Sequence, residues 1–242
     1  MLTTCVSALL LTLSATPEPV AAPPVVGPPA ICFALEVPEG SELLPWGEGP
    51  IATVPTYDRG RLVADLLGAL HGSDDALVHA ENLRRAVIYA GGAAGGKRAR
   101  SARAREALSQ ALAAALEHAL LDELEAVERG ERARDERRLA LLEFDLGYFL
   151  GASRQNGVER DGSADEHLTR AVELAPTDGG LRLAAAMGGF RDLGRDRFEA
   201  WFAASVGLPE RADGLTAKNA LAIGRPFFGV ESLEQLKREL GG

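Results

Sequence analysis

Cysteine and aromatic residues are both scarce in this chain. Only two of the 242 residues are cysteine, Cys5 and Cys32, so the fold cannot depend on a disulfide framework and must be held by packing. Aromatic residues make up 5% of the chain, although hydrophobic residues as a whole reach 46%. Because strands are enriched in aromatic and β-branched residues, this alanine-rich composition favours close-packed helices.

Positive charge and long apolar runs are also lacking. Twenty-six Lys and Arg residues stand against 35 Asp and Glu residues, which gives a formal net charge of -9. Nucleic acid and anionic lipid both require a basic face, so this balance argues against nucleic acid as a general partner. No segment reaches the roughly 20 consecutive apolar residues of a transmembrane helix, and we therefore expect no transmembrane span.

The first 22 residues resemble a targeting segment. A short apolar run, Cys5 to Leu13, is followed by small residues suited to cleavage. Residues 1–22 are therefore predicted to be a signal peptide, and the protein to be exported to the periplasm or the extracellular space. The alternative is a disordered apolar N-terminus. Cleavage would leave Cys32 as a single thiol between Ile31 and Phe33, where we expect it to be buried and inert.

Residues 23–57 are rich in proline and glycine and are predicted to form an extended segment over a helical body, with Trp46 as an anchor. Within this segment, apolar residues alternate with smaller or polar ones. This is the period of a half-buried strand, and its apolar positions are Ile31, Phe33, Leu35 and Val37.

Residues 58–242 are predicted to form one α-helical domain. Helical periodicity and stop signals indicate helices over about 58–71, 73–91, 101–127, 131–156, 163–176, 179–188, 192–206, 216–223 and 232–240. Expected capping residues are Asp58, Ser73, Ser163 and Ser232. The short connections predict an all-α fold of antiparallel helical hairpins, packed as an irregular bundle or a short solenoid.

Residues 148–187 carry small residues where two helices would meet and a proline where the first hairpin would end. The positions concerned are Tyr148, Ala152, Ala164, Leu168, Ala171 and Pro176. This stretch resembles a tetratricopeptide-type helical hairpin. A true repeat stack implies a groove that binds a peptide or a protein. An irregular helical domain with local similarity is the alternative.

Catalytic and cofactor signatures are weak. Residues 91–98, GGAAGGKR, imitate a phosphate-binding loop, but Arg98 stands where the loop needs a hydroxyl for magnesium, so a flexible connection between helices is favoured. Glu143 and Asp145 lie two apart on a helix and should diverge, which argues against a facing pair of catalytic carboxylates. We therefore expect no catalytic residue and no bound cofactor.

The remaining polar residues of interest have plain interpretations. The four histidines have no metal-ligand spacing and are expected at the surface or at helix ends, with no metal site; they are His71, His79, His118 and His167. Glu81 lies three and four residues before Arg84 and Arg85, the spacing of an ion pair on a helix surface.

Two features are candidates for partner binding. Basic residues crowd the start of the helix at 101–127, where the helix dipole disfavours positive charge, and Arg98, Arg100 and Arg103 form the predicted patch. The alternative is a solvated face whose charges are neutralised by neighbouring helices. Trp201 belongs to an aromatic group with Phe198 and Phe202, for which core packing is the alternative to a partner anchor.

The sequence favours an exported, non-catalytic helical protein that binds a protein or peptide partner. Two alternatives stay open: an enzyme with a dispersed active site, and a structural helical subunit of an envelope assembly. A deep polar pocket with perturbed carboxylates would favour the enzyme. A large flat apolar surface would favour the structural subunit.

Overall fold

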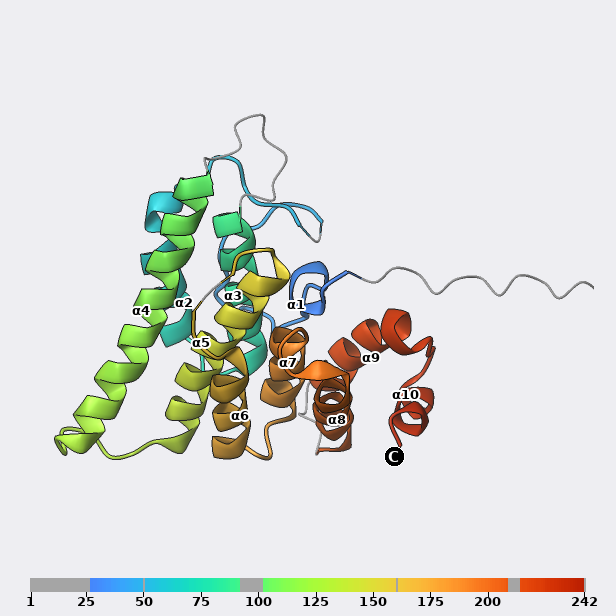
Figure 1. Ribbon diagram of the computed structural model, residues 1–242. Helices are drawn as coiled ribbons and strands as arrows, with labels where there is room; N and C mark the ends of the chain where they lie inside the picture. Colours follow the sequence, from blue (N-terminus) through green and yellow to red (C-terminus); the bar gives the residue numbers. More distant parts are fainter. Residues whose placement is uncertain (1–26, 50, 92–101, 160, 209–213, 242) are drawn as a thin grey trace, which may run out of the picture.

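A computed structural model of the protein describes residues 27–49, 51–91, 102–159, 161–208 and 214–241. Within these ranges every regular element is a helix, which confirms the predicted all-α class (Figure 1). A 3-10 turn at Arg59–Arg61 precedes the second helix. The α-helices are α1 (Pro29–Cys32), α2 (Leu62–His71), α3 (Ala76–Gly91), α4 (Ala102–Glu128), α5 (Glu136–Gln155), α6 (Ala164–Leu174), α7 (Gly179–Gly189), α8 (Gly194–Gly207), α9 (Leu215–Phe228) and α10 (Leu233–Glu239).

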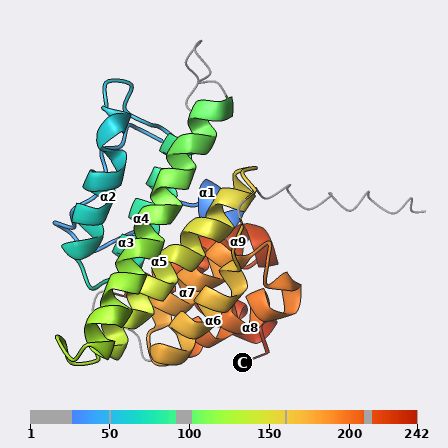
Figure 2. The same ribbon diagram turned by 60° about the vertical axis from the view of Figure 1, so that its left-hand side comes forward.

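Helix α5 lies at the centre of the bundle. It packs against α3, α4, α6 and α7 and also touches α1. Figure 1 shows α2 and α4 at one side of the molecule and α8, α9 and α10 at the other, and Figure 2 shows α4 beside α5. Consecutive helices α4, α5, α6 and α7 run alternately up and down, which confirms the antiparallel hairpins (Figure 1).

Side-chain caps define several helix starts. The Asp58 carboxylate accepts from the Gly60 amide, and Ser163 accepts from the Glu166 amide. Ser232 and Gln235 form the expected reciprocal capping box. Ser73, however, is not the cap of α3: the Asp75 carboxylate accepts from the Leu77 amide instead. The helix begins later because the Ser73 carbonyl turns toward the ring of His79.

The predicted end of α9 at residue 223 is wrong, because the helix continues to Phe228 and contains Pro226. Pro226 cannot bond to the carbonyl of Ala222, but Ala222 is exposed, so water can satisfy that carbonyl. The helix ends instead at Gly229, whose φ of 65° is a left-handed C-terminal stop.

The predicted strand near residues 31–37 is also wrong. Pro28 and Pro29 start the short helix α1, in which proline at the first position is tolerated. From Phe33 onward the chain is extended and its burial alternates, with Leu35 buried and its neighbours more exposed. The alternation of apolar residues does mark one buried face of this segment, but helices rather than a second strand cover that face.

Helices α5 and α7 cross at very close range. Gly151 of α5 lies against the carbonyl of Gly188 in α7, and a Cβ atom built at Gly151 would overlap that carbonyl oxygen. Because the obstacle is backbone rather than a flexible side chain, only separation of the two helices could relieve the overlap. Glycine at position 151 therefore sets the distance between α5 and α7.

Gly151→Ala is expected to lower the free energy of unfolding by about 1–3 kcal/mol, the usual cost of overpacking. The matched control is Gly68→Ala in α2, where an added Cβ meets no atom within 4 Å. Because alanine is the better helix former, the control should raise stability by about 0.5–1 kcal/mol. Urea denaturation of both variants checks the prediction, and equal stabilities would contradict it.

Candidate functional site

The two acidic residues of α5 point to different helices, as their spacing predicts. Asp145 faces α3, where it contacts His79, and Glu143 faces α6, where it contacts His167 and Arg170. The structure therefore brings no facing pair of carboxylates together here, but each carboxylate has a histidine partner. These histidine partners were not predicted.

The His79–Asp145 pair is buried, with 3% and 2% of the two residues exposed. His79 Nδ1 lies 2.7 Å from Asp145 Oδ1, and His79 Nε2 lies 3.0 Å from the carbonyl oxygen of Ser73. The pair thus joins α3, α5 and the turn between α2 and α3. A buried charge-assisted hydrogen bond of this kind fixes the ring in one orientation.

The partners of His79 determine where its protons lie. The Ser73 carbonyl can only accept, so Nε2 carries a hydrogen and donates it. A single proton is then shared between Nδ1 and the Asp145 carboxylate. Since both ring nitrogens are engaged, neither is available to take a proton from a bound molecule.

Burial and charge act in opposite directions on the pair. Burial works to lower the pKa of His79, but the charge and hydrogen bond of Asp145, with the Ser73 carbonyl, outweigh it and raise the pKa above its ordinary value. Burial raises the pKa of Asp145, opposed by His79. Both shifts mean that the folded pair holds its proton more tightly than the separate groups would.

A groove between α2, α4 and α5 leads to this pair. Its inner hollow has a volume of about 80 Å³, with His79 and Asp145 in its wall. An outer hollow of about 430 Å³ lies beside it. The two share five lining residues and so form one continuous surface feature, hereafter the α2–α4–α5 groove: Leu67, His71, Ala119, Leu142 and Arg138.

The inner part of the groove is mainly aliphatic. Leu70, Leu116 and Leu141 complete its walls. The rim is charged, and its central carboxylate is Glu123, only 3% exposed, which lies 2.7 Å from both Arg132 and Arg138. These contacts also neutralise part of the negative charge at the C-terminal end of α4, which the helix dipole disfavours.

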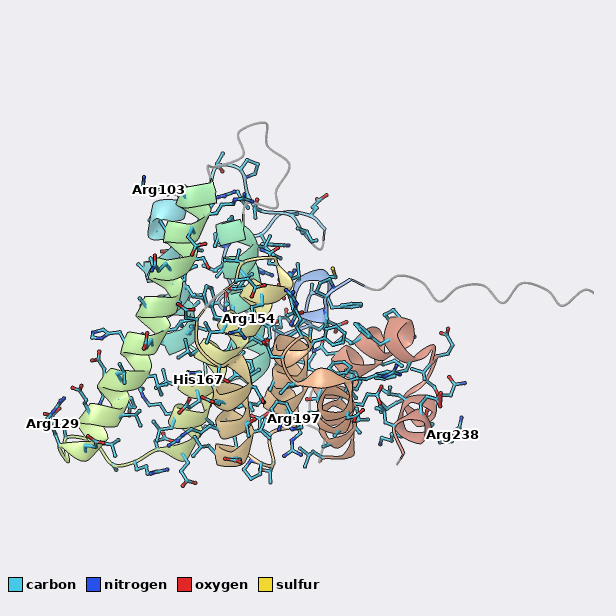
Figure 3. The ribbon with its side chains drawn as sticks, in the orientation of Figure 1. Arg103, Arg129, Arg154, His167, Arg197 and Arg238 are labelled. Atoms are coloured by element: carbon cyan, nitrogen blue, oxygen red, sulfur yellow. The ribbon has the colours of Figure 1, made fainter. Side chains whose placement is uncertain are left out.

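A second polar cluster lies on the face of α5 and α6. Glu143 and His167 are 2.6 Å apart, and Arg170 is 3.1 Å from the other carboxylate oxygen. Arg197 of α8 pairs with Asp165 of α6, the helix that carries His167, and Figure 3 labels both His167 and Arg197. The hollow of about 520 Å³ between them is lined almost wholly by charged residues. It offers no apolar anchor for a ligand.

The third polar cluster corrects the interpretation of Glu81, Arg84 and Arg85 as a surface ion pair. Glu81 does pair with both arginines, at 2.8 and 2.7 Å, but Glu81 and Arg84 are buried, with 1% and 0% of their side chains exposed. The N-terminal segment covers them: the Leu35 amide donates to Glu81, and Arg84 donates to the Ile31 carbonyl.

Of the predicted partner-binding residues, Arg103 and Trp201 lie within the described ranges, on the separate helices α4 and α8. Arg103 is exposed near the start of α4, at the opposite end from Arg129 of the groove rim (Figure 3). Arg98 and Arg100 lie outside the described residues, as does most of the phosphate-loop-like segment at 91–98. Trp201 is half-buried on α8 and packs against the core, in which Phe198 and Phe202 are buried.

The histidine prediction is wrong for His79 and holds in the main for the others. His71 and His118 are exposed, and His167 is 28% exposed. His79 could have been placed inside, because it is three residues after Ala76 and four before Leu83, both on the apolar face of α3.

Cys32 is half-buried, and burial raises its pKa against the opposing charge of Arg84, as expected for an inert thiol.

Across the described ranges, no group of three or more His, Cys, Asp or Glu residues is arranged to hold a metal ion. None of the helices described there combines the length and apolar composition required to cross a membrane.

Comparisons with protein-family models, curated proteins and solved structures find no match to this chain. The tetratricopeptide-type hairpin stays an interpretation from its residues.

Removing the charge of Glu81 should be far more costly than removing a similar exposed charge. Glu81→Gln removes the carboxylate that pairs with the buried Arg84, and we expect it to lower the free energy of unfolding by about 3–5 kcal/mol. Glu125→Gln is the matched control, because Glu125 also pairs with an arginine four residues later, but both side chains are exposed. Little change is expected there. Similar losses in the two variants, measured by urea denaturation, would be inconsistent with this account.

The raised pKa of His79 predicts a pH dependence of stability. A folded-state pKa above the unfolded value of about 6.5 contributes stability that is present below pH 6.5 and lost as the pH rises through the folded pKa. The raised pKa of Asp145 likewise contributes stability at low pH, which is lost as the pH rises through the folded pKa of this carboxyl group. Arg137 opposes protonation of His79, and His71 favours ionisation of Asp145, so both stay unchanged in the test.

The measurement is urea denaturation between pH 6 and pH 9. The unfolding free energy of the unmodified protein should fall more steeply with pH than that of His79→Gln, whereas His118→Gln, at an exposed position, should keep the original slope. A slope that His79→Gln leaves unaltered would show that the pair does not hold the extra proton.

Proposed function

We propose that this protein is an exported, non-catalytic helical protein that binds a protein or peptide partner, and that the α2–α4–α5 groove is the binding surface. The observation that carries the proposal is the groove itself. It joins an aliphatic inner hollow of about 80 Å³ to an outer hollow of about 430 Å³ with a polar rim. An apolar centre with a polar rim is the usual anatomy of a recognition surface.

The size and charge of the groove support one kind of occupant. The inner hollow is smaller than the roughly 150 Å³ of an apolar cavity that takes benzene, so it suits one small aliphatic side chain. The outer hollow is lined by carboxylates and guanidinium groups in equal number: Asp122, Glu123, Glu131, Arg129, Arg132 and Arg138. Because the charges of the rim balance, the rim does not favour a ligand of either charge. The proposed occupant is therefore an uncharged peptide segment with an aliphatic anchor.

The state of His79 favours binding over catalysis at this groove. A general base needs a nitrogen that can reach the proton it removes, and both nitrogens of His79 are held by Asp145 and Ser73. The perturbed carboxylate of Asp145, the feature that would have favoured an enzyme, is likewise used within the pair. His79 and Asp145 then act as positioning residues, which join α3 to α5 behind the inner hollow.

The structural-subunit alternative has less support. Among the described residues, the large hydrophobic side chains classed as exposed are Ile51 and Leu121, which belong to different parts of the fold. They do not make the broad apolar surface of an obligate assembly. Export rests on residues 1–22 and remains a prediction. Arg98, Arg100, Arg103 and Trp201 remain predicted partner contacts, and neither Arg103 nor Trp201 lines the groove.

Two substitutions on α4 test the groove. Ala119 lines both hollows and is half-buried, whereas Ala114 is exposed and lines neither. Ala119→Arg should fill the groove with a charged side chain and abolish partner capture by affinity purification from the native cells. Ala114→Arg makes the same chemical change on the same helix and should leave capture intact.

Photo-crosslinking from the same two positions completes the test. A crosslinker at position 119 should trap the partner through an apolar segment, and one at position 114 should not. Equal capture by both arginine variants, with both proteins folded, would exclude the groove as the binding surface. Turnover of a small molecule that is lost in His79→Gln would favour the enzyme instead.

A further inference from the structure

Residues 30–46, hereafter the strap, begin within α1 and continue from Phe33 as an extended chain that pairs with no strand in the described part of the fold. Backbone amide and carbonyl groups in such a segment need hydrogen-bonding partners when they are buried. Here side chains of the helices supply them. The strap is therefore held in the way that a binding protein holds a peptide ligand.

Two asparagines recognise the strap through paired bonds to its main chain. Asn82 of α3 accepts from the Leu44 amide at 2.8 Å and donates to the Glu42 carbonyl at 3.1 Å. Asn219 of α9 accepts from the Glu36 amide and donates to the Glu36 carbonyl, both at 2.8 Å. Each carboxamide thus forms the pair of main-chain hydrogen bonds that a neighbouring strand would otherwise form.

Charged and aromatic groups of α3 complete the recognition. Arg85 donates to the Leu44 carbonyl at 2.6 Å, and Tyr89 donates to the Pro45 carbonyl. The ring of Trp46 lies 5.0 Å from the guanidinium of Arg84 and 5.4 Å from that of Arg85, within cation–π range.

Buried side chains of the strap fix its register. Leu35 and Leu44 are 6% and 2% exposed and pack into the main core. The site is therefore specific both for extended main chain and for this spacing of leucines. A second copy of the chain carries the same spacing.

The strap is joined to the bundle by a connection that begins at Gly47 and ends before α2. Gly49 has a φ of 106°, a turn that favours glycine and reverses the chain. The strap lies on the N-terminal side of this turn, so it can leave the bundle without threading through it. Opening the turn would let the strap extend toward another molecule.

We propose that the face of α3 and α9 is a site for an extended segment, and that residues 30–46 of a second copy can replace the chain's own strap. The same bonds form in both arrangements, so the exchange alters only which copy supplies the segment. Within one chain the strap is always close, and the single-chain form therefore dominates when the protein is dilute. The exchanged pair forms at high concentration. This proposal does not depend on the partner groove.

Inter-copy disulfide trapping tests the exchange. The Oε2 atom of Glu36, in the strap, lies 3.9 Å from the Nζ atom of Lys218, in α9, and both side chains are exposed. The two test copies are full-length, one carrying Glu36→Cys and the other Lys218→Cys, both in a background with Cys5→Ser and Cys32→Ser. They are mixed at high concentration, warmed briefly so that straps can open, cooled and oxidised.

A disulfide-linked pair of copies is the expected result. The matched control replaces Lys218→Cys by Lys237→Cys, which is also exposed but lies on α10 rather than α9, and no linked pair should form there. A single chain with both Glu36→Cys and Lys218→Cys should close its own disulfide, which shows that the geometry permits the bond. Absence of the 36–218 link between copies, with the single-chain link present, would overturn the proposal, as would equal linking in the Lys237→Cys control.

Discussion

The buried ion pair between Glu81 and Arg84 is the interaction on which the rest of the structure depends. Taking two charges out of water is costly, and the cost is recovered only when each charge has its hydrogen bonds. Glu81 bonds to both arginines and to the Leu35 amide, and Arg84 also bonds to the Ile31 carbonyl. The pair therefore requires the N-terminal segment to be in place. The same hydrogen bonds hold the N-terminal segment at a fixed position on α3.

Helix α3 uses its two sides for different purposes. One side carries Glu81, Asn82 and Arg85, which hold the strap, and its first turn carries His79, which joins Asp145 of α5. The strap and the groove wall thus share one helix as their support. Since α5 also contacts α4, α6 and α7, the His79–Asp145 bond connects the groove to the centre of the bundle. A recognition surface built on such packed helices is held more rigidly than one built on loops.

The helices were predictable because their signals are local. Glycine stops, capping residues and the spacing of leucines lie within a few turns of the ends they define, so α4 and α7 have nearly the predicted bounds and α5 ends within one residue of its predicted end. The errors have local causes too. Helix α9 continues through Pro226 because an exposed helix end tolerates one missing hydrogen bond, and α3 is capped by Asp75 rather than by the nearby Ser73. Alternating burial at Leu35 was real, but it does not reveal whether a strand or a helix covers the chain.

The sequence by itself determined the all-α class, the order and approximate length of the helices, and the divergence of Glu143 from Asp145. Only the tertiary structure decided which partners these residues meet. His79 and Asp145 are 66 residues apart, and Asn219 and Glu36 are 183 apart. Periodicity reports which residues share a face of one helix, but it carries no information on which other element packs there. The groove, the buried ion pair and the strap all arise from such long-range contacts.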